Sequence, residues 1–449
     1  MYLLKKDYLL NITIFIILIC FFCIGKLESE NLDQEIDDLL KINTWELLSK
    51  NLRNSNDLLK ININKNENII SNKGNTYSYK SFDIKELPGY DIWKDPYPKP
   101  VGYIDSYKDN VIFVSGDGVF LYFNYEETSN NNISTQSIKS NISEIIQDKD
   151  FYRPSWISVK DLLIIDNEIY ISYTKEVSEN CYNISILSSN FSFNSLNFSE
   201  FFSYNECVHT KKDVFNAHQS GGKLSYKDEK IIFTTGDFRQ MIKAQDPKSV
   251  LGKIISISMD GKKFEIISYG HRNPQGLFYD NKSNVIINTE HGPRGGDEIN
   301  INFIENDSKK NKTPNFGWPI SSYGEHYDGV YRDYAPLYKS HNEYGYIEPI
   351  KYFDPSIGIS DIVGINELDI QKNSNTNSFF YGAMGTNIDE GDLSIHHIVF
   401  DENYSNILFE DTIIMMDRIR DFEKINHNNQ IYILFVLENN SEIGIIKLI

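Results

Sequence analysis

The stretch KIISISMDGKKFEIISY, residues 253–269, contains two short runs rich in β-branched and aromatic residues on either side of the turn pair Asp260–Gly261. Similar runs recur from about residue 85 to the C-terminal end, and pairs such as DG, DN and NN separate them. No part of this region alternates a strand with a long amphipathic helix, which argues against a doubly wound α/β fold. The pattern predicts an all-β fold, either a sandwich, a barrel or a propeller.

The length of the strand-rich region favours a propeller among these folds. The 449-residue chain leaves about 365 residues in the range 85–449, which is too long for one small barrel. At roughly 45–60 residues for each four-stranded blade, this length corresponds to about six to eight blades. We therefore expect residues 85–449 to form one propeller.

The N-terminal residues have the pattern of an export segment. Lys5 and Lys6 precede the apolar run LLNITIFIILICFFCI, residues 9–24. A run of about 16 residues after a lysine pair is typical of a signal peptide and marginal for a membrane span. We expect residues 1–28 to be a signal peptide, or a membrane anchor if uncleaved, and the protein to be exported to a periplasmic or extracellular location.

Residues 29–84 differ in composition from the rest of the chain. Apolar residues between Ile36 and Leu48 lie near helical spacing, and the Asn-rich segment NINKNENIISNKGN, residues 62–75, resembles a linker. We expect residues 29–84 to form a short helical appendage and linker without chemistry of their own.

Charge and cysteine content narrow the possible partners and compartments. The formal net charge of −19 repels phosphate backbones and argues against nucleic acid as a partner. Two of the four cysteines, Cys20 and Cys23, lie in the apolar run. Cys181 and Cys207 remain, and an oxidising compartment would permit one disulfide between them. Two separate buried thiols are the alternative.

A histidine and an aspartate flank one predicted strand. His218 precedes Gln219, Ser220 and two glycines, and Asp237 follows the next strand-like run. A hairpin-like return could bring the two side chains together. An aspartate bonded to one ring nitrogen fixes the histidine tautomer, so that the other nitrogen can accept a proton. The alternative is a histidine on a surface loop.

The segment GHRNPQGLFYDNKSNVIINTEHGPRGGDEIN, residues 270–300, places many polar groups at both ends of one short strand. Arg272 and Asn273 fit a polar or anionic small ligand. After the strand, outward-facing carbonyls of the Gly-Pro turn and the carboxylates of Asp297 and Glu298 favour a hard cation such as Ca²⁺. An acidic turn without metal is the alternative.

Arg418 and Arg420 alternate in the segment DRIRDF. On a strand both side chains would face the same side. Two like charges on one face repel each other unless an anion lies between them, so an anion site is one interpretation of the pair. An exposed pair over water is the alternative.

The motifs HQSGGKL, GHRNPQGL, TEHGPRGGDEIN, NFGWP, FDPSI and RIRD occur between about residues 210 and 425. Their order and spacing resemble those of the soluble quinoprotein glucose/sorbosone dehydrogenase family, with greater similarity to its aldose sugar dehydrogenase branch. The resemblance implies a six-bladed β-propeller that binds pyrroloquinoline quinone (PQQ) and Ca²⁺ on its central axis.

The resemblance also implies roles for individual residues. His218 would be the general base and Asp237 the carboxylate that orients it. The implied PQQ contacts are Arg272, Asn273, His291, Ser356, Arg418 and Arg420. The carbonyl oxygens of Gly292 and Pro293 would hold the catalytic Ca²⁺, and Glu298 with the carbonyl of Phe316 would hold a second, structural Ca²⁺.

The activity implied by the resemblance is oxidation of an aldose at C1 to the lactone, with hydride transfer to the quinone and an electron acceptor that the sequence does not identify. Two features depart from the family pattern. The segment FFYGAMGTNIDEGDL, residues 379–393, has no lysine where some relatives place one near the quinone, and the N-terminal blades lack the usual opening signature. A propeller that binds a ligand or protein without turnover is the competing interpretation. A calcium-dependent lactonase is a third possible class, but this sequence lacks the carboxylate and asparagine pattern that such an enzyme would need.

Overall fold

The computed structural model describes residues 49–84, 101–130, 132–152, 156–304, 312–366, 375–427 and 430–448. Residues 49–449 form one compact unit. The expected export segment, residues 1–28, and the start of the expected appendage lie outside the described residues. Within the described ranges, no helix combines the length and the apolar character needed to cross a membrane.

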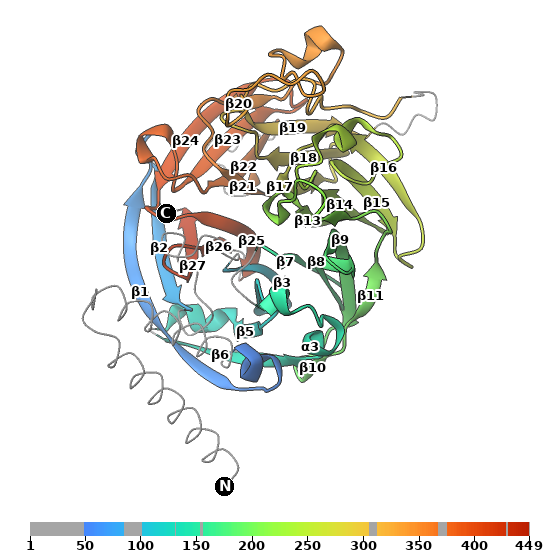
Figure 1. Cartoon of the computed structure of the whole chain (residues 1–449). Helices are drawn as coiled ribbons and strands as arrows, with labels where there is room; N and C mark the ends of the chain where they lie inside the picture. The colour runs from blue at the N-terminus through green and yellow to red at the C-terminus, as the bar shows by residue number, and fades with distance from the viewer. Residues whose placement is uncertain are drawn as a thin grey trace, which may run out of the picture. The chain divides into compact units, whose positions relative to one another are not determined.

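The described residues form a six-bladed β-propeller, which confirms the predicted fold class (Figure 1). Blade 1 contains β3 (Gly102–Tyr107), β4 (Asn110–Ser115), β5 (Phe120–Asn124) and β6 (Asn132–Ser140). Blade 2 contains β7 (Val159–Ile165), β8 (Glu168–Ser178), β9 (Cys181–Asn190), β11 (Ser199–Phe202) and β12 (Val208–His209), and β10 (Ser195–Leu196) pairs with β6. Blade 3 contains β13 (Gly221–Lys227), β14 (Lys230–Thr235), β15 (Lys253–Ser258) and β16 (Phe264–Tyr269).

The remaining blades come from the C-terminal half. Blade 4 contains β17 (Pro274–Asp280), β18 (Val285–Glu290), β19 (Asp297–Phe303) and β20 (Lys351–Phe353). Blade 5 contains β21 (Ile359–Gly364), β22 (Thr376–Ala383), β23 (Ser394–Asp401) and β24 (Ile407–Ile414). Blade 6 contains β25 (Ile419–His427), β26 (Gln430–Leu437), β27 (Glu442–Leu448) and β2 (Thr76–Asp83). Short helices occupy connections: η1 (Tyr125–Ser129), α3 (Ile142–Ile145), η2 (Lys149–Tyr152), η3 (Ala217–Gln219), η4 (Met241–Gln245), η5 (His341–Tyr344) and η7 (Ile388–Glu390).

The ring is closed by strands from both ends of the chain. β2 pairs antiparallel with β27, from Tyr77 opposite Leu448 to Asp83 opposite Glu442, and the two strands lie side by side in Figure 1. The long strand β1 (Leu58–Ile70) pairs with β6 through its first residues and with β2 through its last. Blades 1 and 6 therefore share one continuous hydrogen-bonded sheet.

The expectation that residues 29–84 are a helical appendage and linker is wrong for residues 58–83. These residues form β1 and β2, and the propeller begins before residue 85. On one face of β2, Tyr77 and Tyr79 are buried in the core that also contains Phe435. The many Asn and Lys residues on the outer faces made these strands difficult to recognise from the sequence. The strand that pairs with β2, β27, lies at the other end of the chain.

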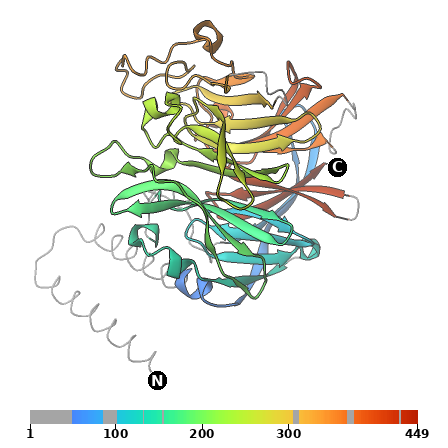
Figure 2. The same cartoon turned by 90° about the vertical axis from the view of Figure 1, so that its right-hand side faces the viewer.

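Buried branched and aromatic side chains fill the space between neighbouring sheets, which pack face to face in the side view (Figure 2). The innermost strands contact one another in a closed ring, from β3 through β7, β13, β17, β21 and β25 back to β3. This arrangement brings short segments that are distant in sequence to one axis.

Aspartates on the inner strands link neighbouring blades. Each accepts a hydrogen bond from a backbone N–H on the inner strand of the next blade. The four pairs are Asp105 with Ile164 (2.5 Å), Asp161 with Leu224 (2.6 Å), Asp361 with Phe422 (3.2 Å) and Asp421 with Ile104 (2.8 Å). The side chains satisfy backbone donors that the separate sheets leave unpaired.

A buried ammonium group lies among three of these aspartates. Nζ of Lys223 lies 2.9 Å from Asp161, 2.7 Å from Asp421 and 3.3 Å from Asp361. Burial raises the pKa of Asp161 to about 7, although Lys223 opposes the shift. Lys223, on β13, thereby connects the inner strands of blades 2, 3, 5 and 6.

The predicted disulfide between Cys181 and Cys207 is confirmed, with Cα atoms 5.5 Å apart. It joins the start of β9 to the segment immediately before β12, which pairs with β9. The bond therefore fixes the outer edge of blade 2.

Replacing Lys223 with Met should lower the free energy of unfolding by about 3–5 kcal/mol, because buried carboxylates lose their cation. Lys230→Met is the matched control, since Lys230 and its partner Glu265 have side chains that are 47% and 77% exposed. Loss of such an exposed pair costs less than about 1 kcal/mol. Urea unfolding of both variants measures the difference, and equal effects would contradict the axial role of Lys223.

Candidate active site

His218 lies on the short helix η3, on the connection that leads into the inner strand of blade 3. Oδ1 of Asn216 accepts from the His218 backbone N–H at 2.8 Å and caps this helix. The side chain is exposed, and its ring packs against the indole of Trp156 with centroids 4.0 Å apart. The following Gly222 has φ of +120°, and a Cβ there would lie 2.4 Å from Cβ of Lys160. Glycine at this position therefore lets blades 2 and 3 approach closely beside His218.

The surroundings of His218 keep its imidazole neutral. Although the ring reaches the surface, desolvation by the protein around it lowers its pKa well below the ordinary value. The positive charges of Lys160, Arg420 and Arg418 lower it further, followed by that of His291. A neutral imidazole has a nitrogen lone pair available to accept a proton.

Sequence reasoning missed Lys160 and Trp156. Lys160 is buried on β7, and its Nζ donates to the carbonyl of Trp156 at 2.7 Å. Its one sequence signal was a lysine inside the otherwise strand-like run SVKDLLII, residues 158–165. Lys160 brings a positive charge to His218 from blade 2, whereas residues 379–393, where the family resemblance would place a lysine, lie in blade 5.

Asp237 does not orient His218 as expected. Its carboxylate accepts from Nε1 of Trp318 at 2.8 Å and from the backbone N–H of Arg239 at 2.8 Å. With its amide oriented to satisfy both neighbours, Gln219 donates to Asp237 at 3.0 Å. Burial raises the pKa of Asp237 to about 6, against the opposing charge of Arg272. None of these bonds between described residues includes the His218 ring, so Trp156 rather than Asp237 supports it.

Arg272 and Asn273 connect strands around the axis. Nη1 of Arg272 donates to the carbonyl of His291 at 2.8 Å, and Nη2 reaches the Gln219 amide oxygen at 3.0 Å. The guanidinium also lies over the ring of Trp318, 5.4 Å from its centroid. Oδ1 of Asn273 accepts from the backbone N–H of Gly221 at 3.1 Å. Both predicted cofactor contacts thus hold the shape of the site through bonds within the protein.

Arg418 and Arg420 lie on the same side of the end of blade 6, and an anion does lie between them. This anion is the carboxylate of Glu438, 3.1 Å from Nε of Arg418 and 2.6 Å from Nε of Arg420. Burial alone would raise the pKa of Glu438, but Arg420 and Arg418 lower it. Nη1 of Arg420 also donates to Oε1 of Gln275 at 3.2 Å. Glu438 is a site residue that the sequence did not single out.

The predicted Ca²⁺ turn at Gly292 and Pro293 is held by its neighbours. The backbone N–H of Gly292 donates to Asp297 at 2.9 Å, and Ser356 Oγ donates to the carbonyl of Pro293 at 3.4 Å. Ser356, a predicted cofactor contact, therefore lies at one predicted metal ligand. Next to this turn, Nε2 of His291 is buried and has no hydrogen-bond partner among the described residues.

A buried histidine–carboxylate pair adjoins the backbone of Arg272. Nδ1 of His271 lies 2.9 Å from Oε1 of Glu290, and Oε2 of Glu290 accepts from the Arg272 backbone N–H at 2.8 Å. Nδ2 of Asn300 donates to Glu290 at 2.8 Å and to Glu298 at 3.2 Å. The pair supports the turn that carries Arg272 and Asn273, and sequence reasoning did not identify it.

The residues predicted to hold a second Ca²⁺ contact a histidine ring instead. Nδ1 of His341 lies 2.8 Å from the carbonyl oxygen of Phe316, and Nε2 lies 3.2 Å from Oε1 of Glu298. Burial alone would lower the pKa of His341, but Glu298 and the Phe316 carbonyl raise it. The imidazole lies between both predicted ligands, so these residues do not fit a cation at that position.

Two further observations bear on ligand binding. In the ranges that the structure covers, no group of three or more His, Cys, Asp or Glu side chains is arranged to hold a metal.

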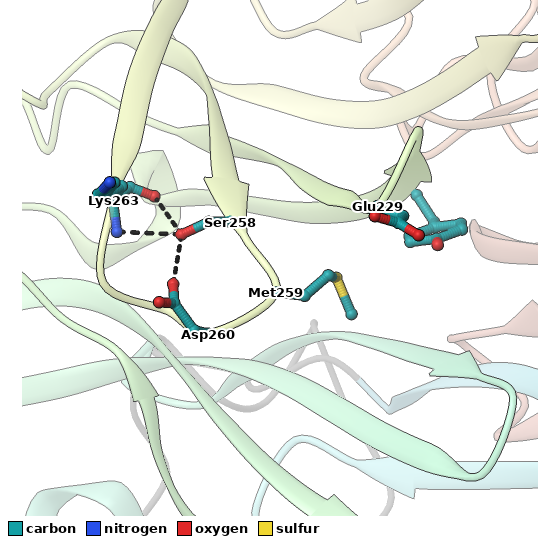
Figure 3. Close-up of a pocket in the computed structure, with 6 residues that line it drawn as sticks. Glu229, Ser258, Met259, Asp260 and Lys263 are labelled. Carbon is teal, nitrogen blue, oxygen red and sulfur yellow. Dashed lines mark hydrogen bonds between the residues drawn. The ribbon is translucent and has the colours of Figure 1, made fainter.

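A hollow of about 520 Å³ at the turn between β15 and β16 includes Glu229, Met259 and Asp260 in its lining, and Ser258 Oγ donates to Asp260 at 2.6 Å (Figure 3). None of the predicted site residues lines this hollow.

The fold and the site define a six-bladed propeller with a basic axial site around a neutral histidine. Residues 164–444 match the sequence model of the Glucose / Sorbosone dehydrogenase family, and the chain belongs to this family. It is 33% identical over 221 residues to the uncharacterized protein slr1608 of Synechocystis sp. (46% of this chain, 48% of the relative). It is 32% identical over 160 residues to the aldose sugar dehydrogenase YliI of Escherichia coli (32% and 40%). The chain thus spans about half or less of the length of these relatives.

Solved structures share the fold at low sequence identity. The apo-form of the soluble aldose sugar dehydrogenase of Escherichia coli has a TM-score of 0.60 and 20% identity, covering 87% of this chain and 100% of that chain. The PQQ-bound aldose sugar dehydrogenase of Streptomyces coelicolor has a TM-score of 0.54 and 14% identity, covering 78% and 95%. These likenesses confirm the six-bladed architecture.

Replacing Lys160 with Met should raise the pKa of His218, because removal of a nearby positive charge favours the protonated imidazolium. Lys212→Met is the control, since Lys212 is exposed in the loop before η3. NMR titration of the histidine ring protons measures both variants in the absence of any cofactor. A His218 pKa that is equal in wild type and Lys160→Met would contradict the electrostatic account of this site.

Proposed function

We propose that this chain is a quinoprotein sugar dehydrogenase that oxidises an aldose at C1 to the lactone, with PQQ as its cofactor. The observation that carries the proposal is the concentration of positive charge from Lys160, Arg418 and Arg420 beside a neutral, accessible His218. Relatives support the class of reaction. The Escherichia coli relative is named an aldose sugar dehydrogenase, and a relative from Acinetobacter calcoaceticus, 27% identical over 149 residues (26% of this chain, 29% of the relative), is named quinoprotein glucose dehydrogenase B.

The residues present fit a polyanionic quinone. Among the described residues, the guanidinium groups of Arg418 and Arg420 both contact the carboxylate of Glu438, so two positive charges lie next to each other at the axis. Lys160 adds a further positive charge near His218, and the buried Nε2 of His291 offers a hydrogen-bonding group beside Arg272. Guanidinium groups suit carboxylates through paired N–H donors. We propose that Arg418 and Arg420 bind the cofactor carboxylates and that His291 and Ser356 lie at its edge.

We also propose that the turn at Gly292 and Pro293 binds the catalytic Ca²⁺. The carbonyl oxygens of Gly292 and Pro293 are hard ligands of the kind that Ca²⁺ prefers. When bound, PQQ supplies the electron acceptor of the reaction, and Ca²⁺ beside it polarises the quinone. The bonds from Asp297 and Ser356 hold the turn in place for this role.

The chain's own residues supply the base and its positioning. We propose that His218 takes the proton of the C1 hydroxyl on a ring nitrogen, since its lowered pKa keeps it neutral at neutral pH. Trp156 packs against the ring and limits its rotation. Asp237 acts at a distance from the base: through Trp318 and Gln219 it holds the groups around Arg272.

We also propose that the protein is exported and acts on a small-molecule substrate. An exported protein, anchored to a membrane only if its N-terminal segment stays uncleaved, agrees with a disulfide between Cys181 and Cys207. The substrate is a small sugar, and an external acceptor must reoxidise the cofactor. A binding propeller without turnover is the second candidate, because Arg272 and the Arg418–Arg420 pair already have protein partners.

Wild-type protein reconstituted with PQQ and Ca²⁺ should reduce a dye acceptor with an aldose as substrate. His218→Ala should lower kcat by about 10²–10⁴-fold, the usual contribution of a general base, while PQQ absorbance shows unchanged occupancy. His209→Ala is the control, since His209 lies on β12 at the outer edge of blade 2. Cofactor binding without oxidation of any aldose in a broad panel would favour the binding propeller.

A further inference from the structure

The contacts of His341 differ from what a second structural Ca²⁺ requires. His341 is the first residue of η5 and is 1% exposed, while Glu298 lies on β19 and is 6% exposed. The ring has the Phe316 carbonyl at Nδ1 and the Glu298 carboxylate at Nε2, at 2.8 Å and 3.2 Å. The two oxygens expected to share one cation therefore lie at opposite ends of one imidazole.

The His341 ring and a Ca²⁺ ion cannot occupy the same space between Glu298 and the Phe316 carbonyl. Ca²⁺ binds oxygen at about 2.3–2.6 Å. A cation bonded to the Phe316 carbonyl and to Glu298 would have to occupy the space that the His341 ring fills. The ring is also held from the side, since Tyr323 stacks on it with centroids 5.5 Å apart and planes 17° apart. The backbone carbonyl of His341 accepts from the N–H of Tyr346 at 3.0 Å, which fixes the start of η5.

The carboxylate of Glu298 has protein neighbours at both oxygens. One oxygen faces His341, and the other accepts from Nδ2 of Asn300 at 3.2 Å. A carbonyl oxygen can only accept, so Nδ1 of His341 carries the proton that is donated to Phe316. The Phe316 carbonyl thus meets an N–H donor in place of a cation, and Oε1 of Glu298 faces the buried Nε2 of the same ring at 3.2 Å without a formed hydrogen bond. The Phe316 carbonyl and Oε2 of Glu298 therefore have donors within the protein, which offset the cost of burying them.

We propose that His341 takes the place of the structural cation: in this chain the Glu298–Phe316 site holds an imidazole ring and binds no Ca²⁺. The proposal concerns this site alone and is independent of sugar oxidation and of the turn at Gly292 and Pro293. Its readout is the number of bound ions, so failure of the proposed function would leave it intact.

Counting ions tests the proposal. Wild type and Glu298→Gln are dialysed against saturating Ca²⁺, and bound calcium per chain is measured by mass spectrometry. The two proteins should bind equal amounts, because Glu298 ligates nothing in wild type. One additional ion per chain in wild type would overturn the proposal.

A cavity variant tests the role of the ring itself. His341→Ala should bind one Ca²⁺ more than wild type at millimolar Ca²⁺, and His341→Ala with Glu298→Gln should lose that ion. The vacated space would be faced by Glu298, the Phe316 carbonyl and Oγ of Ser321, which has no hydrogen-bond partner among the described residues. Addition of Ca²⁺ should also raise the melting temperature of His341→Ala, and this increase should be several degrees larger than the increase for wild type.

The matched control is His271→Ala, which removes another buried histidine paired with a carboxylate, Glu290. It should gain no ion. A gain in the control, or no gain in His341→Ala, would overturn the assignment of the ring as the replacement for a cation.

If His341→Ala does not fold, wild-type crystals decide the question. Crystals soaked in Tb³⁺ as a Ca²⁺ substitute should show imidazole density and no anomalous peak between Glu298 and the Phe316 carbonyl. A peak there would overturn the proposal.

Discussion

The buried ammonium group of Lys223 is the constraint on which the axial face depends. It binds aspartates from three other blades, and an unpaired charge at this depth would cost several kcal/mol. Two site residues stand next to those aspartates in sequence: Lys160 precedes Asp161, and Arg420 precedes Asp421. The ion cluster that holds the inner strands together therefore also fixes the positive charges around His218. Stability and site geometry rest on the same bonds.

The same positive charges serve two purposes at this site. In the proposed function they would attract an anionic ligand, and they lower the pKa of His218 so that the ring stays neutral. Glu438 lies between Arg418 and Arg420 and limits their repulsion before any ligand binds. A site assembled in this way needs little rearrangement to accept an anion, which is the advantage of preorganised charge.

Sequence patterns predicted the all-β class and the strand-rich runs, because inner strands of a propeller are short, β-branched and separated by turn pairs. The family resemblance implied that His218, His291, Arg418 and Arg420 share one axial site, and in the structure the charges of the other three lower the pKa of His218. The ring closure by β2 and β27 could not be predicted locally, since the two strands lie at opposite ends of the chain. The contacts of Asp237 with Trp318 and of Glu298 with His341 could not be predicted for a similar reason. Trp318 and His341 lie in a long connection between strands, and only tertiary packing defines its path.

The central claim is that the axial cluster binds an anionic quinone, and equilibrium binding tests it most directly. PQQ is titrated into the cofactor-free protein in the presence of Ca²⁺ and followed by calorimetry, without any sugar. We expect one PQQ per chain, and at least about 100-fold weaker binding in the Arg418→Ala, Arg420→Ala double variant, because hydrogen bonds to charged groups contribute about 1.5–3 kcal/mol each. Equal affinity of the two proteins, or no binding to wild type, would contradict the account.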